Sequence, residues 1–242
     1  RFLTEERARR QIKATFQQYV SHDVIEQMLH DPEMAKLGGQ ERVLTVLFND
    51  LAGFTSYSEK YTPSEIIMVL GEYFDRMTEI IFANRGTLTA YVGDELMAIF
   101  GAPVRASDHA KLACRAALAM QEARHQLAQE WAKIGRPPLK ARTGINSGVM
   151  LVGNYGSKYR FNYSVLGDQV NLASRLEQLG KPYGIEIMIG DGTAELIGDG
   201  FLLRELDKVQ VKGRKQALRI YELLGVRKAV LPPNQTEMLR LY

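Results

Sequence analysis

Asp50 has the type and position of a metal-binding residue. It follows an apolar, β-branched run beginning at Val43, which is typical of a strand buried on both faces. Gly53 comes next, and a glycine lets backbone amides approach a ligand closely. A carboxylate beside exposed amides suits a metal-bound phosphate, because the oxygen binds the cation and the N–H groups face the anion. The plainer alternative is that Asp50 only begins a turn.

A second acidic segment, Gly93-Asp94-Glu95, joins the two apolar stretches 87–92 and 96–100. A Gly-Asp pair between two apolar strands is also typical of an ordinary hairpin. If these strands and the Asp50 strand share one sheet, Asp50 and Asp94 could share a cation site. Two carboxylates so close would repel each other unless a cation lay between them.

Asn171 and Arg175 are four residues apart, so they share one face of the helix predicted after Gly167. Together they could orient a ribose and neutralise charge on a phosphate, although a plain polar helix face is the alternative. Arg142 interrupts an otherwise small and apolar strand and is either solvated or directed at an anion. The basic turn 212–215 is either solvated or covers a triphosphate.

The elements that must position these side chains follow from local signals. Thr62, Pro63 and Glu65 predict a capped helix that Gly86 ends. Further helices are expected over 107–134 and 191–197. Strands are expected over 87–92, 96–100, 141–147, 149–152, 160–166, 185–189, 201–211 and 218–224, with Gly148 dividing two of them and a turn over 153–158. Strands alternating with helices, with hairpins among them, predict an α+β sheet with helices packed on it.

Composition limits what the chain can be. Its 242 residues, 45% of them apolar, can form one large domain, and the net charge of +3 gives no warrant for a nucleic-acid partner. The single cysteine, Cys114, excludes an intrachain disulfide and fits a reducing compartment. No apolar run reaches the length of a membrane span, and no signal peptide is visible.

Three segments are predicted: a helical connector over 1–38, a main domain over 39–225 and a tail over 226–242. The connector is charged but repeats apolar residues at helical spacing. Because the chain begins with Arg1 and not Met, we expect a fragment of a longer protein. The expected whole is a cytoplasmic domain attached to an upstream sensor or membrane domain.

Four stretches together resemble the motifs of class III adenylate cyclases, in family order. Residues 46–55 resemble the first metal motif, 91–101 the second, 165–175 the transition-state helix, and 211–213 the late phosphate-binding turn. The resemblance covers about residues 40–225. It implies a ferredoxin-like class III nucleotidyl cyclase fold, with a central, mostly antiparallel sheet flanked by helices.

The resemblance also implies a mechanism, the cyclisation of ATP to cyclic AMP with release of pyrophosphate. Asp50, Asp94 and the backbone carbonyl of Leu51 would hold two Mg²⁺ or Mn²⁺ ions per site. Arg175 would stabilise charge on the α-phosphoryl group, and Asn171 would position the ribose. The implied substrate-binding residues are Phe54, Thr55, Ala90, Arg142, Ser164 and Lys212, of which Arg142 and Lys212 would bind phosphates.

In this family the metal aspartates of one subunit face the Asn/Arg helix of the other. This chain carries both sets, so the resemblance implies a head-to-tail homodimer with two equivalent sites. As the output domain of a signalling protein, it would receive its signal through the 1–38 connector.

One position departs from the family pattern. Adenylate cyclases commonly carry a lysine three residues before the glycine of the second metal motif, and guanylate cyclases a glutamate, whereas this chain has Ala90. The partner base-reading position holds Ser164, which can still form a hydrogen bond. ATP is the expected substrate, with relaxed or GTP selectivity as an alternative.

Two further hypotheses compete with a purine nucleotide cyclase. The first is a non-catalytic, cyclase-like module that binds nucleotide and dimerises. Ala90 slightly favours this module, whereas the intact set of Asp50, Asp94, Asn171 and Arg175 argues against it. The second is a diguanylate cyclase, which has no counterpart of the Asn171/Arg175 helix.

Overall fold

The computed structural model describes residues 37–157, 159–210 and 217–227. Nearly all of the predicted 1–38 connector therefore lies outside the described residues. The same is true of Lys212 and of residues 228–242 of the predicted tail.

The described part of the chain alternates strands and helices. The strands are β1 (Gly38–Ala52), β2 (Gly86–Val92), β3 (Glu95–Phe100), β4 (Lys140–Ser157), β5 (Arg160–Leu166), β6 (Ile187–Gly190), β7 (Phe201–Val209) and β8 (Leu218–Val226). The helices are α3 (Phe54–Ser58), α4 (Pro63–Ala83), α5 (His109–Lys133), α6 (Asp168–Tyr183) and α7 (Asp191–Ile197), with a 3-10 turn η2 (Gly198–Gly200).

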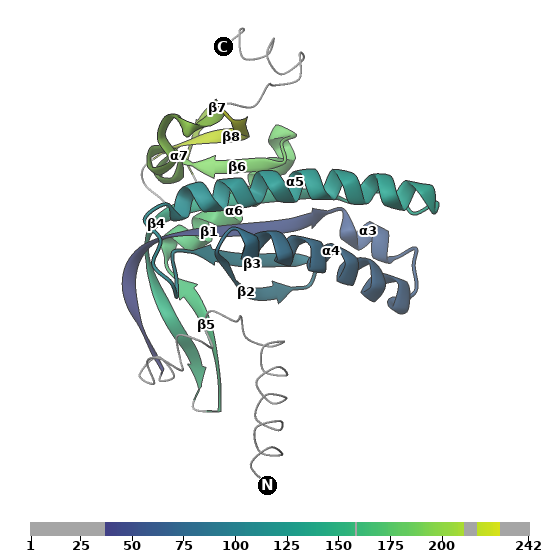
Figure 1. Cartoon of the computed structure of the whole chain (residues 1–242), viewed down its shortest axis with the longest axis horizontal. Helices are drawn as coiled ribbons and strands as arrows, with labels where there is room; N and C mark the ends of the chain where they lie inside the picture. The colour runs from purple at the N-terminus through teal and green to yellow at the C-terminus, as the bar shows by residue number, and fades with distance from the viewer. Residues whose placement is uncertain (1–36, 158, 211–216, 228–242) are drawn as a thin grey trace.

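All eight strands belong to one sheet, which has the order β2-β3-β1-β4-β6-β8-β7, with β5 paired to β4 outside this order. The pairing of β4 with β6 is parallel and the other pairings are antiparallel. Figure 1 shows β1 and β4 in the middle of the molecule and β4 and β5 extending from it as an arm. The predicted α+β fold with a mostly antiparallel sheet is confirmed.

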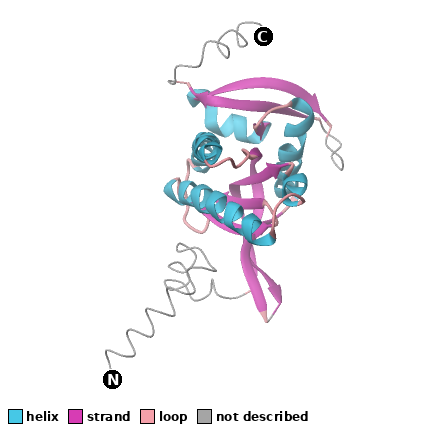
Figure 2. Cartoon of the chain, turned by 90° about the vertical axis from the view of Figure 1, so that its right-hand side faces the viewer, coloured by secondary structure: helices cyan, strands magenta, loops and turns pink. Residues whose placement is uncertain are grey.

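Helices cover both faces of this sheet, as the side view in Figure 2 shows. Successive residues of β1 point to opposite faces. Leu47 packs with Tyr73 of α4 and Met120 of α5 in one core cluster. Val46 packs with Ala173 of α6 in a second cluster on the other face. The end of β1 therefore lies between a two-helix layer and a one-helix layer.

Local signals predicted the start of α4 correctly but not its end. The Thr62 side chain accepts from the Glu65 backbone N–H and the Glu65 carboxylate accepts from the Thr62 backbone N–H, which is the predicted capping box. The helix ends at Ala83, before Gly86, and Arg85 takes the left-handed conformation with φ 59°. Gly86 begins β2 instead, where a Cβ would lie 2.7 Å from the Phe100 ring.

The prediction that Gly148 divides two strands and that 153–158 is a turn was wrong. β4 is continuous from Lys140 to Ser157, because β1 pairs with it along the whole of Gly38–Ala52 and those ladder bonds override the weak strand preference of glycine. A Cβ on Gly153 would lie 2.1 Å from the Gly38 carbonyl oxygen, so this glycine permits close strand approach. The short helix α3 was not predicted. The first strand was predicted to begin at Val43 but begins at Gly38, five residues earlier. The bounds of the other predicted strands and of the helices predicted over 107–134 and 191–197 are within two residues of those observed.

Candidate functional site

The two predicted metal aspartates meet at one edge of the sheet. β1 and β3 are antiparallel neighbours, and Asp50 is the Cα partner of Glu95. The turn before Glu95 is opened by Gly93 at φ 65°, a left-handed conformation that suits glycine, and it presents Asp94 beside Asp50. The Asp94 carboxyl group is near enough to raise the pKa of Asp50. Their predicted proximity is therefore confirmed.

The environment of Asp50 disfavours its negative charge. Burial raises the pKa of Asp50 above its usual value, Asp94 raises this pKa further, and Arg142 opposes both effects. Burial also raises the pKa of Glu95, with contributions from Asp50 and Asp94. Acidic groups are therefore concentrated in a half-buried place where mutual repulsion is strong, and a cation would relieve that repulsion.

These residues fit a magnesium ion that shares its ligands with a phosphate substrate. Within residues 37–157, 159–210 and 217–227, no group of three or more His, Cys, Asp or Glu side chains is arranged to hold a metal ion by itself. Mg²⁺ is usually held by one or two carboxylates together with substrate phosphates, so the Asp50–Asp94 pair is sufficient. The Leu51 side chain is buried in the core, so Leu51 can contribute only its backbone.

Arg142 lies between carboxylates of its own chain. It is the Cα partner of Asp50 across β1 and β4. Its Nη2 donates to Asp50 Oδ2 at 3.1 Å and its Nε donates to Glu177 Oε1 at 2.8 Å. Burial raises the pKa of Glu177 to about 7, and Arg142 opposes that shift. The structure thus gives Arg142 two anionic partners, and its predicted phosphate contact stays a prediction.

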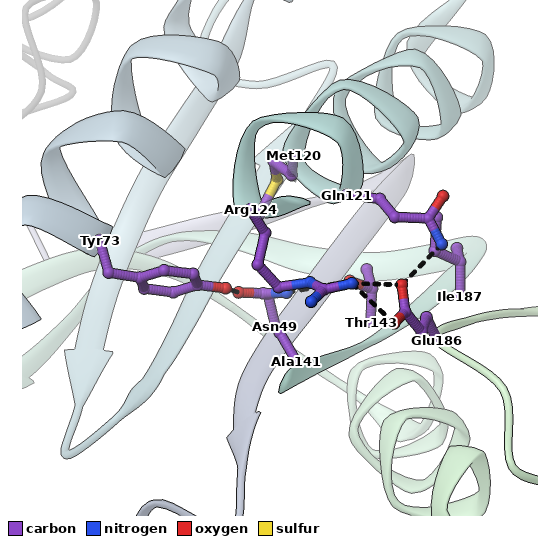
Figure 3. A pocket seen from close by; sticks show the side chains of 9 residues that line it. All are labelled: Asn49, Tyr73, Met120, Gln121, Arg124, Ala141, Thr143, Glu186 and Ile187. Atoms are coloured by element: carbon purple, nitrogen blue, oxygen red, sulfur yellow. Dashed lines mark hydrogen bonds and ion pairs between the residues drawn. The ribbon is translucent and has the colours of Figure 1, made fainter. Parts of the chain in front are cut away.

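A layer of buried polar side chains supports the ends of β1 and β4 from the other face of the sheet (Figure 3). Tyr73 Oη donates to Asn49 Oδ1 at 2.5 Å, and Asn49 Nδ2 donates to Thr143 Oγ1 at 3.0 Å. Nearby, Arg124 pairs with Glu186 at 2.6 Å. Asn49 and Thr143 are the chain neighbours of Asp50 and Arg142, so this layer fixes the backbone that carries the candidate site.

Asn171 and Arg175 lie on α6 but are turned away from the Asp50 of the same chain. The helix advances by about 100° per residue, which places Arg175 about 160° and Asn171 about 120° around the axis from Glu177. Glu177 is the α6 residue that reaches Arg142 beside Asp50. The predicted Asn/Arg face is confirmed as one face of α6. Within one chain, this face of α6 points away from Asp50 and its acidic neighbours Asp94 and Glu95.

Phe54 and Thr55 form the first turn of α3, directly after Asp50, Leu51 and Gly53. Gly53 has φ 78°, a left-handed conformation that suits glycine, and the predicted close approach of its backbone amides to a ligand stays a prediction. Thr55 is exposed, and the Phe54 ring stacks on Tyr57 with 5.9 Å between centroids.

The two predicted base-reading positions come from touching strands, since β2 and β5 are in contact. A bulge between Leu88 and Ala90 shifts the register of β2 and aligns Ala90 with Met97. Met97 in turn pairs with Phe48 on β1. Ala90 therefore belongs to a row of half-buried apolar side chains, and Ser164 on β5 supplies a hydroxyl.

Glu177 was missed in the sequence although a signal for it existed. It is 3% exposed and lies among the buried positions of α6, with Ala173, Leu176 and Gly180. A carboxylate at a core position of an amphipathic helix requires a partner. Glu95 was noted only as part of a turn. Asn49 carried no signal, because its partners are distant in the sequence.

Comparison with known proteins gives matches over most of the chain. Residues 39–225 match the family model described as "Adenylate and Guanylate cyclase catalytic domain". A curated relative, "Adenylate cyclase 1" of Rhizobium meliloti (strain 1021), is 36% identical over 223 residues, which cover 92% of this chain. The aligned part is only 33% of that relative's length, so the chain spans about a third of it.

Two solved structures are similar in both sequence and fold. The guanylyl cyclase Cya2 is 37% identical with a TM-score of 0.72, and the match covers 79% of this chain and 96% of that one. The adenylyl cyclase CyaB from P. aeruginosa is 36% identical with a TM-score of 0.73, and the match covers 80% of this chain and 100% of that one.

Proposed function

The chain belongs to the adenylate and guanylate cyclase catalytic domain family, and from this premise we propose that it converts ATP into 3′,5′-cyclic AMP and pyrophosphate. The observation that carries the proposal is the meeting of Asp50 and Asp94 at one sheet edge, where their charges repel without a cation. A family member that had lost catalysis would have no need to keep this costly pair together.

In the proposed reaction the ribose 3′-hydroxyl loses its proton to solvent, and its oxygen attacks the α-phosphorus in line. A bond forms between O3′ and the α-phosphorus, the bond from that phosphorus to the bridging oxygen breaks, and pyrophosphate leaves. Two Mg²⁺ or Mn²⁺ ions would favour the 3′-oxyanion and neutralise the triphosphate. Asp50, Asp94 and the Leu51 carbonyl would hold these ions.

Asn171 would orient the ribose, and the Arg175 guanidinium would donate to the α-phosphoryl oxygens as their charge grows. Lys212 would bind the leaving phosphates. Phe54 and Thr55 would line the substrate site beside Asp50 and Asp94. The exposure of Asn171 and the half-burial of Arg175 support this, because both side chains are accessible to a ligand.

We propose that the active species is a head-to-tail homodimer. Asn171 and Arg175 point away from their own Asp50, so a second copy would have to bring the two halves together. An apolar patch is available to bury. Val43, Val149, Leu151 and Leu166 are adjacent through strand pairing, and each is between 37% and 56% exposed.

In the longer protein this domain would be the output of an upstream sensor that changes how the two copies meet. No helix in the described residues is long and apolar enough to cross a bilayer.

A second candidate, relaxed or GTP selectivity, is favoured by the apolar row that contains Ala90. Ala90, Met97 and Phe48 offer a surface to a purine ring but no charge that distinguishes adenine from guanine. The similarity to a guanylyl cyclase at 37% identity agrees with this alternative. Ser164 would then supply the hydrogen bond to the base.

The test is product formation from ATP and from GTP in Mn²⁺, analysed by mass spectrometry, with Asp50→Ala as the control. We expect the wild-type chain to form cyclic AMP and the Asp50→Ala variant to form none. Cyclic GMP as the sole product would keep the mechanism and reverse the substrate. No product at a protein concentration where dimers form would leave a nucleotide-binding module as the better description.

A further inference from the structure

Arg142 links three elements around the acidic pair. It is held on β4, pairs with Asp50 on β1 and pairs with Glu177 on α6. Two different nitrogens make these contacts, so one guanidinium can hold both carboxylates at once. Its aliphatic stem passes Gly180 of α6, where a Cβ would lie 3.1 Å from Arg142 Cδ.

Burial distinguishes the two carboxylate partners. The Glu177 side chain is only 4% exposed, whereas that of Asp50 is 24% exposed. A buried carboxylate requires a charged partner to carry its charge, and Arg142 is that partner for Glu177. Asp50 is the partner open to solvent, and it can exchange the guanidinium for another cation.

The charges around Arg142 do not balance. Asp50, Asp94, Glu95 and Glu177 all contribute negative charge to this region. Among the described residues, Arg142 is the cationic side chain that forms ion pairs with this group. A bound divalent cation would repel the guanidinium and take over the compensation of Asp50.

We propose that Glu177 is a positioning residue that acts through Arg142, keeping the guanidinium beside Asp50 as a counter-ion that an incoming divalent cation displaces. When the cation binds, Glu177 retains the guanidinium, so that no buried charge is left unpaired. The proposal rests on the proposed function, because it takes Asp50 as a cation ligand. The proposed role belongs to the nucleotide-free site, and it stands beside the phosphate contact that the family resemblance implies for Arg142.

The test is Mn²⁺ binding by the nucleotide-free chain, measured by electron paramagnetic resonance. Arg142→Met should bind Mn²⁺ about tenfold more tightly, because a competing cation is gone. Glu177→Gln should bind it about tenfold more weakly, because the guanidinium then has Asp50 as its ionised partner. In the double variant Arg142→Met/Glu177→Gln the effect of the Glu177 change should vanish.

Several outcomes would overturn the proposal. A Glu177→Gln effect that persists without Arg142 would show direct action on the cation. Unchanged Mn²⁺ affinity with a lowered Tm in Glu177→Gln would show that Glu177 has a purely structural role. An Arg142→Met variant that changes only the KM for ATP would leave the phosphate contact as the role of Arg142. Mn²⁺ binding that is absent, or that survives Asp50→Asn, would also contradict it. Because this readout needs no turnover, its failure can be told apart from failure of the proposed function.

If Arg142→Met does not fold, a second measurement on the wild-type chain tests the same point. The ¹H–¹⁵N signal of the Arg142 Nε–H group can be assigned by its loss in Arg142→Lys. The Nε–H proton should stay protected from solvent exchange when Mg²⁺ is added, because Glu177 keeps that hydrogen bond. Loss of protection at saturating Mg²⁺ would refute the retained Arg142–Glu177 pair.

Discussion

Among the single residues, Glu177 sets a measurable dependence of stability on pH. Burial raises the pKa of Glu177 to about 7 in the folded chain, against about 4.3 for an unfolded glutamate. Between these values the folded state binds more protons than the unfolded state, so the free energy of unfolding falls as pH rises. The contribution of Glu177 to the free energy of unfolding is complete below about pH 4.3 and is lost as pH rises through about 7.

We therefore expect Glu177→Gln to flatten the pH profile of stability. In metal-free buffer the wild type should lose Tm between pH 5 and pH 8, and the variant should lose less over the same range. The raised pKa values of Asp50 and Glu95 should leave some of the slope in place. Equal slopes for the two proteins would show that Glu177 titrates normally.

Also at the residue scale, Arg175→Ala should lower kcat by roughly 10²–10³, the loss typical of removing one donor to a developing anion. The KM for ATP should change much less, because the contact strengthens only as charge develops. Lys181→Ala, an exposed residue in the last turn of the same helix, is the matched control and should leave kcat unchanged. A loss below tenfold for Arg175→Ala would contradict the proposed role.

At the scale of elements, the approach of α6 to β4 depends on Gly144. A Cβ there would lie 2.2 Å from the Ala173 carbonyl oxygen and 2.3 Å from the Glu177 backbone nitrogen. Both are backbone atoms that cannot rotate away. Gly144 on the neighbouring strand therefore sets the position of α6, the helix that carries Asn171, Arg175 and Glu177.

Gly144→Ala should accordingly destabilise the fold by at least about 1–3 kcal/mol, the usual cost of overpacking, and should displace α6. The measurement is the urea unfolding midpoint. Gly71→Ala is the matched control, because a Cβ added there in the α4 helix would meet no atom within 4 Å beyond its chain neighbours and the helix's own backbone. It should stabilise by about 0.5–1 kcal/mol. Unchanged stability in Gly144→Ala would mean that α6 is less closely packed than described.

For the whole molecule, the orientation of α6 predicts complementation between two inactive variants. Asp50→Asn and Arg175→Ala should each retain about 1% of the wild-type rate or less when alone. Mixed and allowed to exchange subunits, they should regain about a quarter of the wild-type rate, since about half of the dimers are mixed and each keeps one of two sites. A mixture that stays inactive despite proven exchange would show that each site lies within one chain.

Much of the fold was predictable because its signals are local. The capping box of Thr62 and Glu65 joins residues three apart, so the start of α4 needs no distant partner. The Gly93-Asp94 turn joins strands that are adjacent in the sequence, and it was predicted for the same reason. The positions of Asn171 and Arg175 on one helical face likewise follow from periodicity alone.

Where these local elements meet was decided only by the tertiary structure. Arg142 is 92 residues from Asp50 and 35 residues from Glu177, and no spacing rule relates residues so far apart. The continuity of β4 through Gly148 and Gly153 likewise depends on ladder bonds to β1, a strand about a hundred residues earlier. The sequence by itself determined which side chains are the candidates for the chemistry of this protein. Long-range strand pairing and burial decided which of these side chains form ion pairs, because such contacts depend on packing and not on local conformational preference.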